Sequence, residues 1–144
     1  MRYAYALTVE EAEDGVTVTC SDIPEMVTCG ATRAEAIARA EDALVSALSF
    51  YVEEGRPIPA PSTLSGRDVA VVPMLEAGKL ALHDALLEAG MTNVELGRRL
   101  GIDEKAARRL RDPLHRSRVA YVEAALRALG RRIVVEVEPV GEVA

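Results

Sequence analysis

Residues 93–110, NVELGRRLGIDEKAARRL, constrain the fold most, because their pattern predicts two short helices separated by a glycine. Gly101 can adopt the left-handed backbone that ends a helix, and Gly97, one turn earlier, permits a close helix crossing. Residues 92–95 have the form of a capping box, and Asp103 can cap the second helix. The apolar positions that such a pair must bury together are Leu96, Leu100, Ile102, Ala107 and Leu110. The spacing predicts a helix-turn-helix.

The second predicted helix carries a basic face. Lys105, Arg108 and Arg109 lie three and four residues apart, opposite the apolar positions. A solvated helical hairpin is the alternative interpretation, since exposed arginines often need no further explanation. Because these are the positions that a recognition helix directs at DNA, we expect all three to contact base edges or phosphates in a major groove. Four flanking residues should contact mainly phosphate: Arg98, Arg99, Arg116 and Arg118.

The charges are unevenly distributed along the 144 residues. The whole chain has a net charge of -6. Residues 1–68 carry 5 basic and 12 acidic side chains, whereas residues 98–118 carry 8 basic and 3 acidic ones. Nonspecific binding of nucleic acid by the whole surface is therefore not expected, and any DNA contact must be local. At 49% hydrophobic residues the chain can bury a core or divide into two small domains.

The N-terminal half has the pattern of a small sheet with a covering helix. Apolar residues alternate along 3–9 and 16–20 around a turn at Asp14-Gly15, which predicts an antiparallel hairpin. A third short strand is expected at 26–29. A second capping box, at 32–35, begins a helix that ends before Gly55. The proline-rich residues after it predict an extended connection with few packing contacts, and residues 69–73 predict a fourth strand at an edge of the sheet.

The C-terminal half is predicted to hold four helices and a terminal strand. Residues 75–89 and a segment from about Ser117 to Gly130 flank the hinged pair. Residues 133–137 are strongly β-forming, but a lone strand on a helical domain leaves its backbone groups unpaired. We therefore expect them to pair with the same strand of a second chain, which would place two recognition helices on a palindrome; the alternative is that they join the N-terminal sheet. The proposed dimer contacts are Ile133, Val134, Val135 and Val137.

Composition also favours a cytoplasmic protein. We find neither an N-terminal apolar leader nor an apolar run of membrane-spanning length. Cys20 and Cys29 fall in separate predicted strands and could face each other. In a reducing compartment two cysteines are more often free buried thiols than a disulfide or a metal pair, and we expect that here.

The N-terminal half resembles the HicB family of antitoxins from bacterial toxin-antitoxin pairs. The residues that carry the resemblance are Tyr3, Tyr5, the hairpin EAEDGVTV at 11–18, Ser21-Asp22-Ile23-Pro24, Val27-Thr28-Cys29-Gly30 and Thr32-Arg33-Ala34-Glu35-Ala36. Glu25 departs from the glycine that commonly follows this proline in the family. The resemblance implies an α+β protein. Residues 1–74 would form a partial ribonuclease-H-like ββ(β)αβ module that binds the HicA toxin, and residues 75–144 an all-α helix-turn-helix domain with a terminal β-strand.

The residues do not support an enzyme. A ribonuclease-H-like nuclease needs converging carboxylates around two divalent ions, one of them in the middle of the first strand. Tyr5 and Leu7 stand there instead. His83 and His115 lie in or beside different predicted helices without a ligand at metal spacing, and we expect neither a metal nor a cofactor.

Two functions remain. The first is an antitoxin that neutralises a HicA-like, messenger-RNA-cleaving toxin and represses its own operon by binding operator DNA, as a homodimer or higher homo-oligomer. The second is a stand-alone transcription regulator whose N-terminal module senses a small ligand. The acidic charge of residues 1–68 favours the first, because an RNA-cleaving toxin is expected to be basic.

Overall fold

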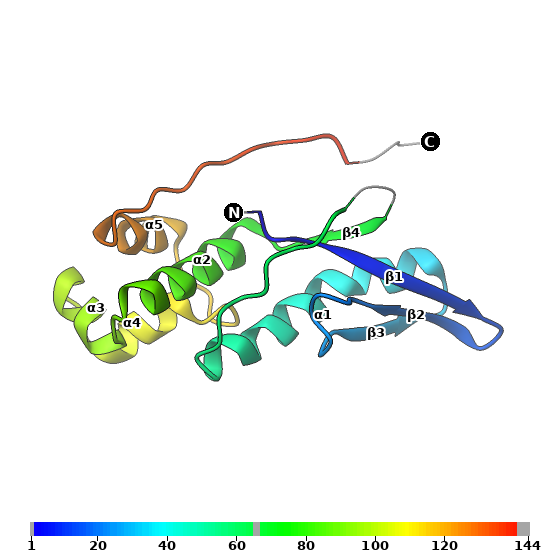
Figure 1. The fold of residues 1–144 in the computed structure, drawn as a ribbon, viewed down its shortest axis with the longest axis horizontal. Helices are drawn as coiled ribbons and strands as arrows, with labels where there is room; N and C mark the ends of the chain where they lie inside the picture. Colours follow the sequence, from blue (N-terminus) through cyan, green and yellow to red (C-terminus); the bar gives the residue numbers. More distant parts are fainter. Residues whose placement is uncertain (1, 65–66, 141–144) are drawn as a thin grey trace.

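A computed structural model describes residues 2–64 and 67–140 and shows a mixed α+β fold. The four strands are β1 (Ala4–Ala12), β2 (Gly15–Thr19), β3 (Val27–Gly30) and β4 (Asp68–Val71). They form one sheet in the order β3-β2-β1-β4, and all neighbours are antiparallel. Helix α1 (Arg33–Glu53) packs along this sheet (Figure 1). The predicted hairpin, third strand, helix and edge strand are therefore confirmed.

The local signals of the sheet and of α1 act as predicted, except that the capping box at residues 32–35 forms only in part. In the β1–β2 turn Gly15 has a φ of 146°, a backbone conformation that residues with a side chain rarely adopt. Thr32 caps α1 by accepting a hydrogen bond from the Glu35 amide, while the Glu35 carboxylate accepts one from the amide of Ala31. The helix stops at Glu53, before Gly55, as its apolar stripe predicts.

Four helices build the other end of the molecule, as predicted: α2 (Met74–Ala89), α3 (Asn93–Leu100), α4 (Glu104–Arg111) and α5 (Val119–Ala128). Figure 1 shows α3 and α4 at the end farthest from the β1–β2 turn, with α2 running between the two halves. Helix α2 begins directly after Pro73 and ends at Gly90, whose φ of 61° is the left-handed conformation of a C-cap.

Helix α2 belongs to both hydrophobic cores. Leu80 is fully buried in the core of the sheet and α1, whereas Leu82 and Leu86 are fully buried in the core of the helical half. Ala81 packs against both. The two halves are consequently joined by a continuous helix that each of them needs for packing.

The proline-rich connection packs more closely than predicted. Ile58 is buried, and its amide donates a hydrogen bond of 3.0 Å to Asp84 Oδ1. The Tyr5 hydroxyl donates to the Pro59 carbonyl at 2.8 Å, and the Ser62 amide donates to Asp22 at 2.9 Å. An extended segment outside a sheet must find partners for its backbone groups, and here side chains supply them.

The pairing of residues 133–137 with a second copy stays a prediction, whereas the alternative, that they join the N-terminal sheet, is wrong. Residues 131–140 are extended but form no strand, and they do not join the sheet. They run back past α2 (Figure 1), with Ile133 packed on the helical core and Arg2 paired with Glu138 at 2.6 Å. Val134 and Val137 are 81% and 92% exposed. A β-strand requires a neighbour for its backbone groups, and one copy of this chain offers none.

Candidate nucleic-acid interface

Three short-range signals define the ends of α3 and α4 and the turn between them. Thr92 and Glu95 form a complete capping box at the start of α3. Gly101 ends α3 at φ 71°, and the Ile102 amide then donates to the Gly97 carbonyl at 2.9 Å. Asp103 caps α4 by accepting a 2.7 Å hydrogen bond from Ala106. Both helix starts and the turn are confirmed.

Gly97 is required by the turn itself. A Cβ atom built there would lie 2.7 Å from the carbonyl oxygen of Ile102, a backbone atom that cannot rotate away. The predicted lack of room for a larger side chain is confirmed, but the backbone of the turn and not a crossing helix fills the space.

Most of the apolar positions predicted for the pair are buried. Leu96, Ala107 and Leu110 lie in the core of the helical half, with Leu100 partly buried against it. Ile102 is the exception, because it stands in the turn and keeps 36% of its surface exposed. Its expected burial was wrong.

The basic face of α4 is free. Lys105, Arg108 and Arg109 are exposed on the side of α4 opposite Ala107 and Leu110. Among the described residues none of the three forms an ion pair. Arginines in the last turn of a helix also interact favourably with the helix dipole. That interaction does not explain why three basic side chains lie together without acidic partners in the described part of the chain.

The flanking arginines come from the neighbouring segments. Arg98 and Arg99 are exposed in the last turn of α3, and Arg116 and Arg118 are exposed in the loop before α5. Arg99 is partly engaged, because its guanidinium donates to the Ala128 carbonyl at 3.2 Å. The seven predicted residues thus belong to three consecutive segments of the helical half.

Sequence reasoning missed a buried ammonium behind α4. The Lys79 side chain, on α2, is fully buried. It donates to the carbonyls of Arg109, Asp112 and His115 at 2.8, 3.0 and 2.5 Å, and it lies 2.7 Å from the Ser117 hydroxyl. Burial lowers the pKa of Lys79 to about 8, so it is charged at pH 7. It therefore fastens the end of α4 and the loop that follows.

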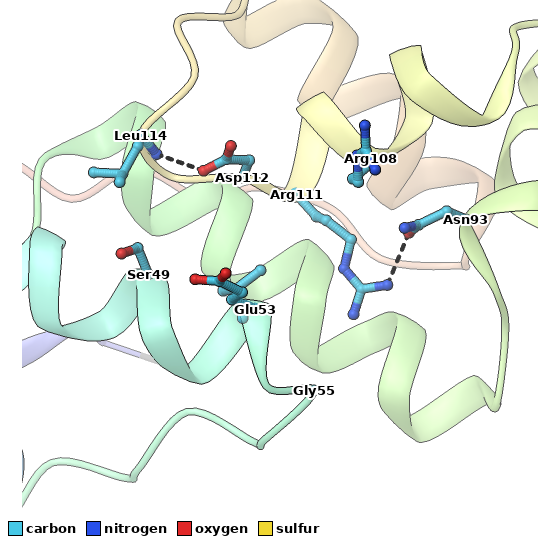
Figure 2. A pocket seen from close by; sticks show the side chains of 9 residues that line it. Ser49, Glu53, Gly55, Asn93, Arg108, Arg111, Asp112 and Leu114 are labelled. Atoms are coloured by element: carbon cyan, nitrogen blue, oxygen red, sulfur yellow. Dashed lines mark hydrogen bonds between the residues drawn. The ribbon is translucent and has the colours of Figure 1, made fainter.

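A second buried polar group, His83, lies one turn further along α2. Its Nδ1 is 2.6 Å from the Arg111 guanidinium of α4, and its Nε2 is 2.7 Å from the Arg56 carbonyl. Arg111 also donates to the Asn93 side chain at 2.9 Å, as Figure 2 shows. The only sequence signal for either residue is a polar side chain on the buried stripe of α2, at i and i+4.

A hollow of about 590 Å³ opens between the end of α1 and α4 (Figure 2). Both acidic residues, Glu53 and Asp112, and basic residues, Arg108 and Arg111, line this hollow. Within the described parts of the chain, no three potential ligand side chains gather closely enough to hold a metal ion.

The two cysteines are free thiols, as expected. Cys20 is buried but Cys29 is exposed, so the expected burial of Cys29 was wrong.

Comparison with known proteins identifies the class. Residues 2–81 match the HicB-like antitoxins of bacterial toxin-antitoxin systems, a match over more than half of the chain. The protein therefore belongs to the HicB family of antitoxins. Antitoxin HicB of Pseudomonas fluorescens is 44% identical over 138 residues, 94% of each chain. Antitoxin HicB of Escherichia coli is 40% identical over 134 residues, 92% of this chain and 96% of the relative.

This family consists of antitoxins and not of enzymes, which confirms the prediction that the chain is not an enzyme. At the centre of β1, Tyr5 and Leu7 are buried in the core of the sheet and α1. No helix among the described residues combines the length and the apolar character needed to cross a membrane.

Proposed function

We propose that the protein neutralises a HicA-like, messenger-RNA-cleaving toxin through its N-terminal module and represses its own operon through α4. The observation that carries this proposal is the 44% identity to an antitoxin over 94% of both chains. The acidic charge of residues 1–68, with 12 acidic and 5 basic side chains, would steer a basic toxin to the N-terminal module in the cytoplasm. The module would be a reduced ribonuclease-H-type fold, supported by its three-stranded meander, helix and return strand; such a fold does not itself imply cleavage.

The proposal as a whole is tested by co-expression with the product of the adjacent reading frame. The expected result is a stable complex that elutes as one species, in which ribonuclease activity is suppressed. If the neighbour encodes a basic toxin and no complex forms, the antitoxin role is excluded.

We infer that the toxin-binding unit, residues 1–74, needs α2 in order to fold. Leu80 lies in the sheet core, and Asp84 accepts hydrogen bonds from the Tyr3 hydroxyl and the Ile58 amide. A chain ending at 74 loses these contacts, at a cost of at least about 3 kcal/mol in unfolding free energy. A chain ending at Gly90 keeps them.

A fragment of residues 1–90 is therefore expected to fold and bind toxin, whereas residues 1–74 should be unfolded. Leu82→Gln and Leu86→Gln belong in the longer fragment, since the cut exposes both side chains. Circular dichroism checks folding and calorimetry checks binding. A folded 1–90 fragment without affinity for the toxin would place the toxin surface elsewhere.

In the proposed DNA-binding role, α3 and α4 form a helix-turn-helix and α4 is the recognition helix. Its exposed, unpaired Lys105, Arg108 and Arg109 support this role. Arg98, Arg99, Arg116 and Arg118 would contact phosphate from either side. One such motif contacts few bases, so we also propose that residues 133–137 pair two copies about a two-fold axis.

Substituting Arg108→Ala and Arg109→Ala together should lower operator affinity by about 100-fold or more and reduce the preference for operator over random DNA. Fluorescence anisotropy with a duplex from upstream of the gene measures both quantities. Arg127→Ala is the matched control, because Arg127 is exposed on α5 and already paired with Glu123 at 2.8 Å. Unchanged binding by the double variant would exclude α4 as the recognition helix.

A further inference from the structure

Arg111 belongs to the basic cluster by sequence but not by position. It follows Arg108 and Arg109 on α4, yet its guanidinium points inward to His83 and Asn93, on α2 and α3. Its Nε is buried and has no hydrogen-bond partner among the described residues. A side chain turned inward in this way is badly placed to contact DNA.

The direction of each hydrogen bond around His83 follows from the chemistry of the groups. A guanidinium only donates, so His83 Nδ1 must accept from Arg111. The proton then resides on Nε2, which donates to the Arg56 carbonyl. Burial lowers the pKa of His83, in keeping with a neutral ring.

The chain of bonds joins α4 to the N-terminal half. Arg56 lies three residues after the end of α1, and Ile58, two residues further on, donates its amide hydrogen bond to Asp84 of α2. From α2, His83 is thus hydrogen-bonded to the Arg56 carbonyl and Asp84 to the Ile58 amide, while His83 also contacts Arg111 of α4. Both ring nitrogens of His83 have partners in this part-buried network, so another arrangement of the segments that it joins would leave a buried polar group without its bond.

We propose that Arg111 and His83 are positioning residues for the recognition helix, and that through them the orientation of α4 depends on residues 56–58 of the N-terminal half. This inference rests on the proposed operator-binding role of α4. The planar guanidinium reaches Asn93 and His83 together from only a narrow range of α4 orientations. The basic residues that face DNA are carried on the same two turns.

Salt dependence separates a positioning residue from a phosphate contact. In the full-length protein, Arg111→Ala removes the charge together with both bonds. A positioning residue contacts no phosphate, so this variant should weaken operator binding by about tenfold or more and leave the slope of log K against log salt unchanged. Arg108→Ala, the matched control, should lower the magnitude of that slope by about 0.9. A change of slope in Arg111→Ala, or unaltered affinity, would overturn the proposal.

Two further measurements test whether the bonds from Arg111 through His83 to Arg56, here called the relay, connect α4 to the N-terminal half. His83→Gln should weaken operator binding as well, and the double variant should be no weaker than the poorer single variant, because both changes break one chain of bonds. Additive losses would contradict the relay. Amide hydrogen exchange of the free protein should accelerate in both α4 and residues 56–58 of Arg111→Ala. The exchange measurement needs no DNA. If the wild-type protein binds no operator, the proposed DNA-binding role fails. Unaltered exchange at residues 56–58 would separately overturn the proposed connection between these residues and α4.

Discussion

Lys79→Met is expected to destabilise the full-length protein by about 3 kcal/mol, the usual scale for removing one partner of a buried charged network. Methionine resembles the unbranched aliphatic part of the lysine side chain but lacks the ammonium, so the carbonyls of Arg109, Asp112 and His115 lose their buried donor. The His115 carbonyl loses the shortest of these bonds, at 2.5 Å. The free energy of urea unfolding at pH 7 measures the effect.

Lys105→Met is the matched control for Lys79→Met. Lys105 is exposed on α4, so the same change in chemistry there should alter stability by no more than about 0.5 kcal/mol. The pH matters, because burial lowers the pKa of Lys79 to about 8 and the comparison requires a protonated side chain. Equal stability of the two variants would show that the buried ammonium does not hold the end of α4.

Deleting residues 132–144 should abolish dimerisation and reduce operator affinity by about 100-fold or more, while toxin capture persists. Residues 133–137 carry the exposed Val134, Val135 and Val137, and their extended backbone is outside any sheet of the single chain. Pairing with a second copy would satisfy those backbone groups and cover the valines. Light scattering gives the mass, and anisotropy gives the affinity.

A shorter deletion, of residues 139–144, is the control for the terminal segment. It leaves residues 133–137 and the Arg2–Glu138 ion pair in place, so the protein should dimerise and bind operator normally. If the protein lacking residues 132–144 is still a DNA-binding dimer, another surface joins the two copies.

The sequence predicted those parts of the fold whose cause is local. Capping by Thr92 and Asp103, the left-handed Gly101 and the tight approach at Gly97 each depend on a few neighbouring residues, and all are present. Alternation in the first 20 residues similarly predicted the hairpin. Exposure of the basic face of α4 followed from the same helical periodicity.

The errors concern contacts between distant segments. Nothing near Lys79 in sequence indicates that the end of α4 will meet it, because its partners lie 30 to 38 residues away. Composition alone suggested a loose proline segment, yet Asp84 and Tyr5 bind it. For residues 133–137, strand propensity did not indicate the partner: the sheet of the same chain does not include them, and their pairing with a second copy stays a prediction. Long-range pairing of this kind cannot be inferred from one sequence.

Sharing α2 between two cores has a consequence for turnover of the protein. With Leu80 in one core and Leu82 in the other, an opening that frees α2 exposes apolar surface in both halves at once. A protease that cuts α2 in this open form would therefore leave neither half with its complete core, and no folded piece that binds toxin but not DNA would remain. In a cell, silencing of the toxin and silencing of the operon would then decay with one half-life.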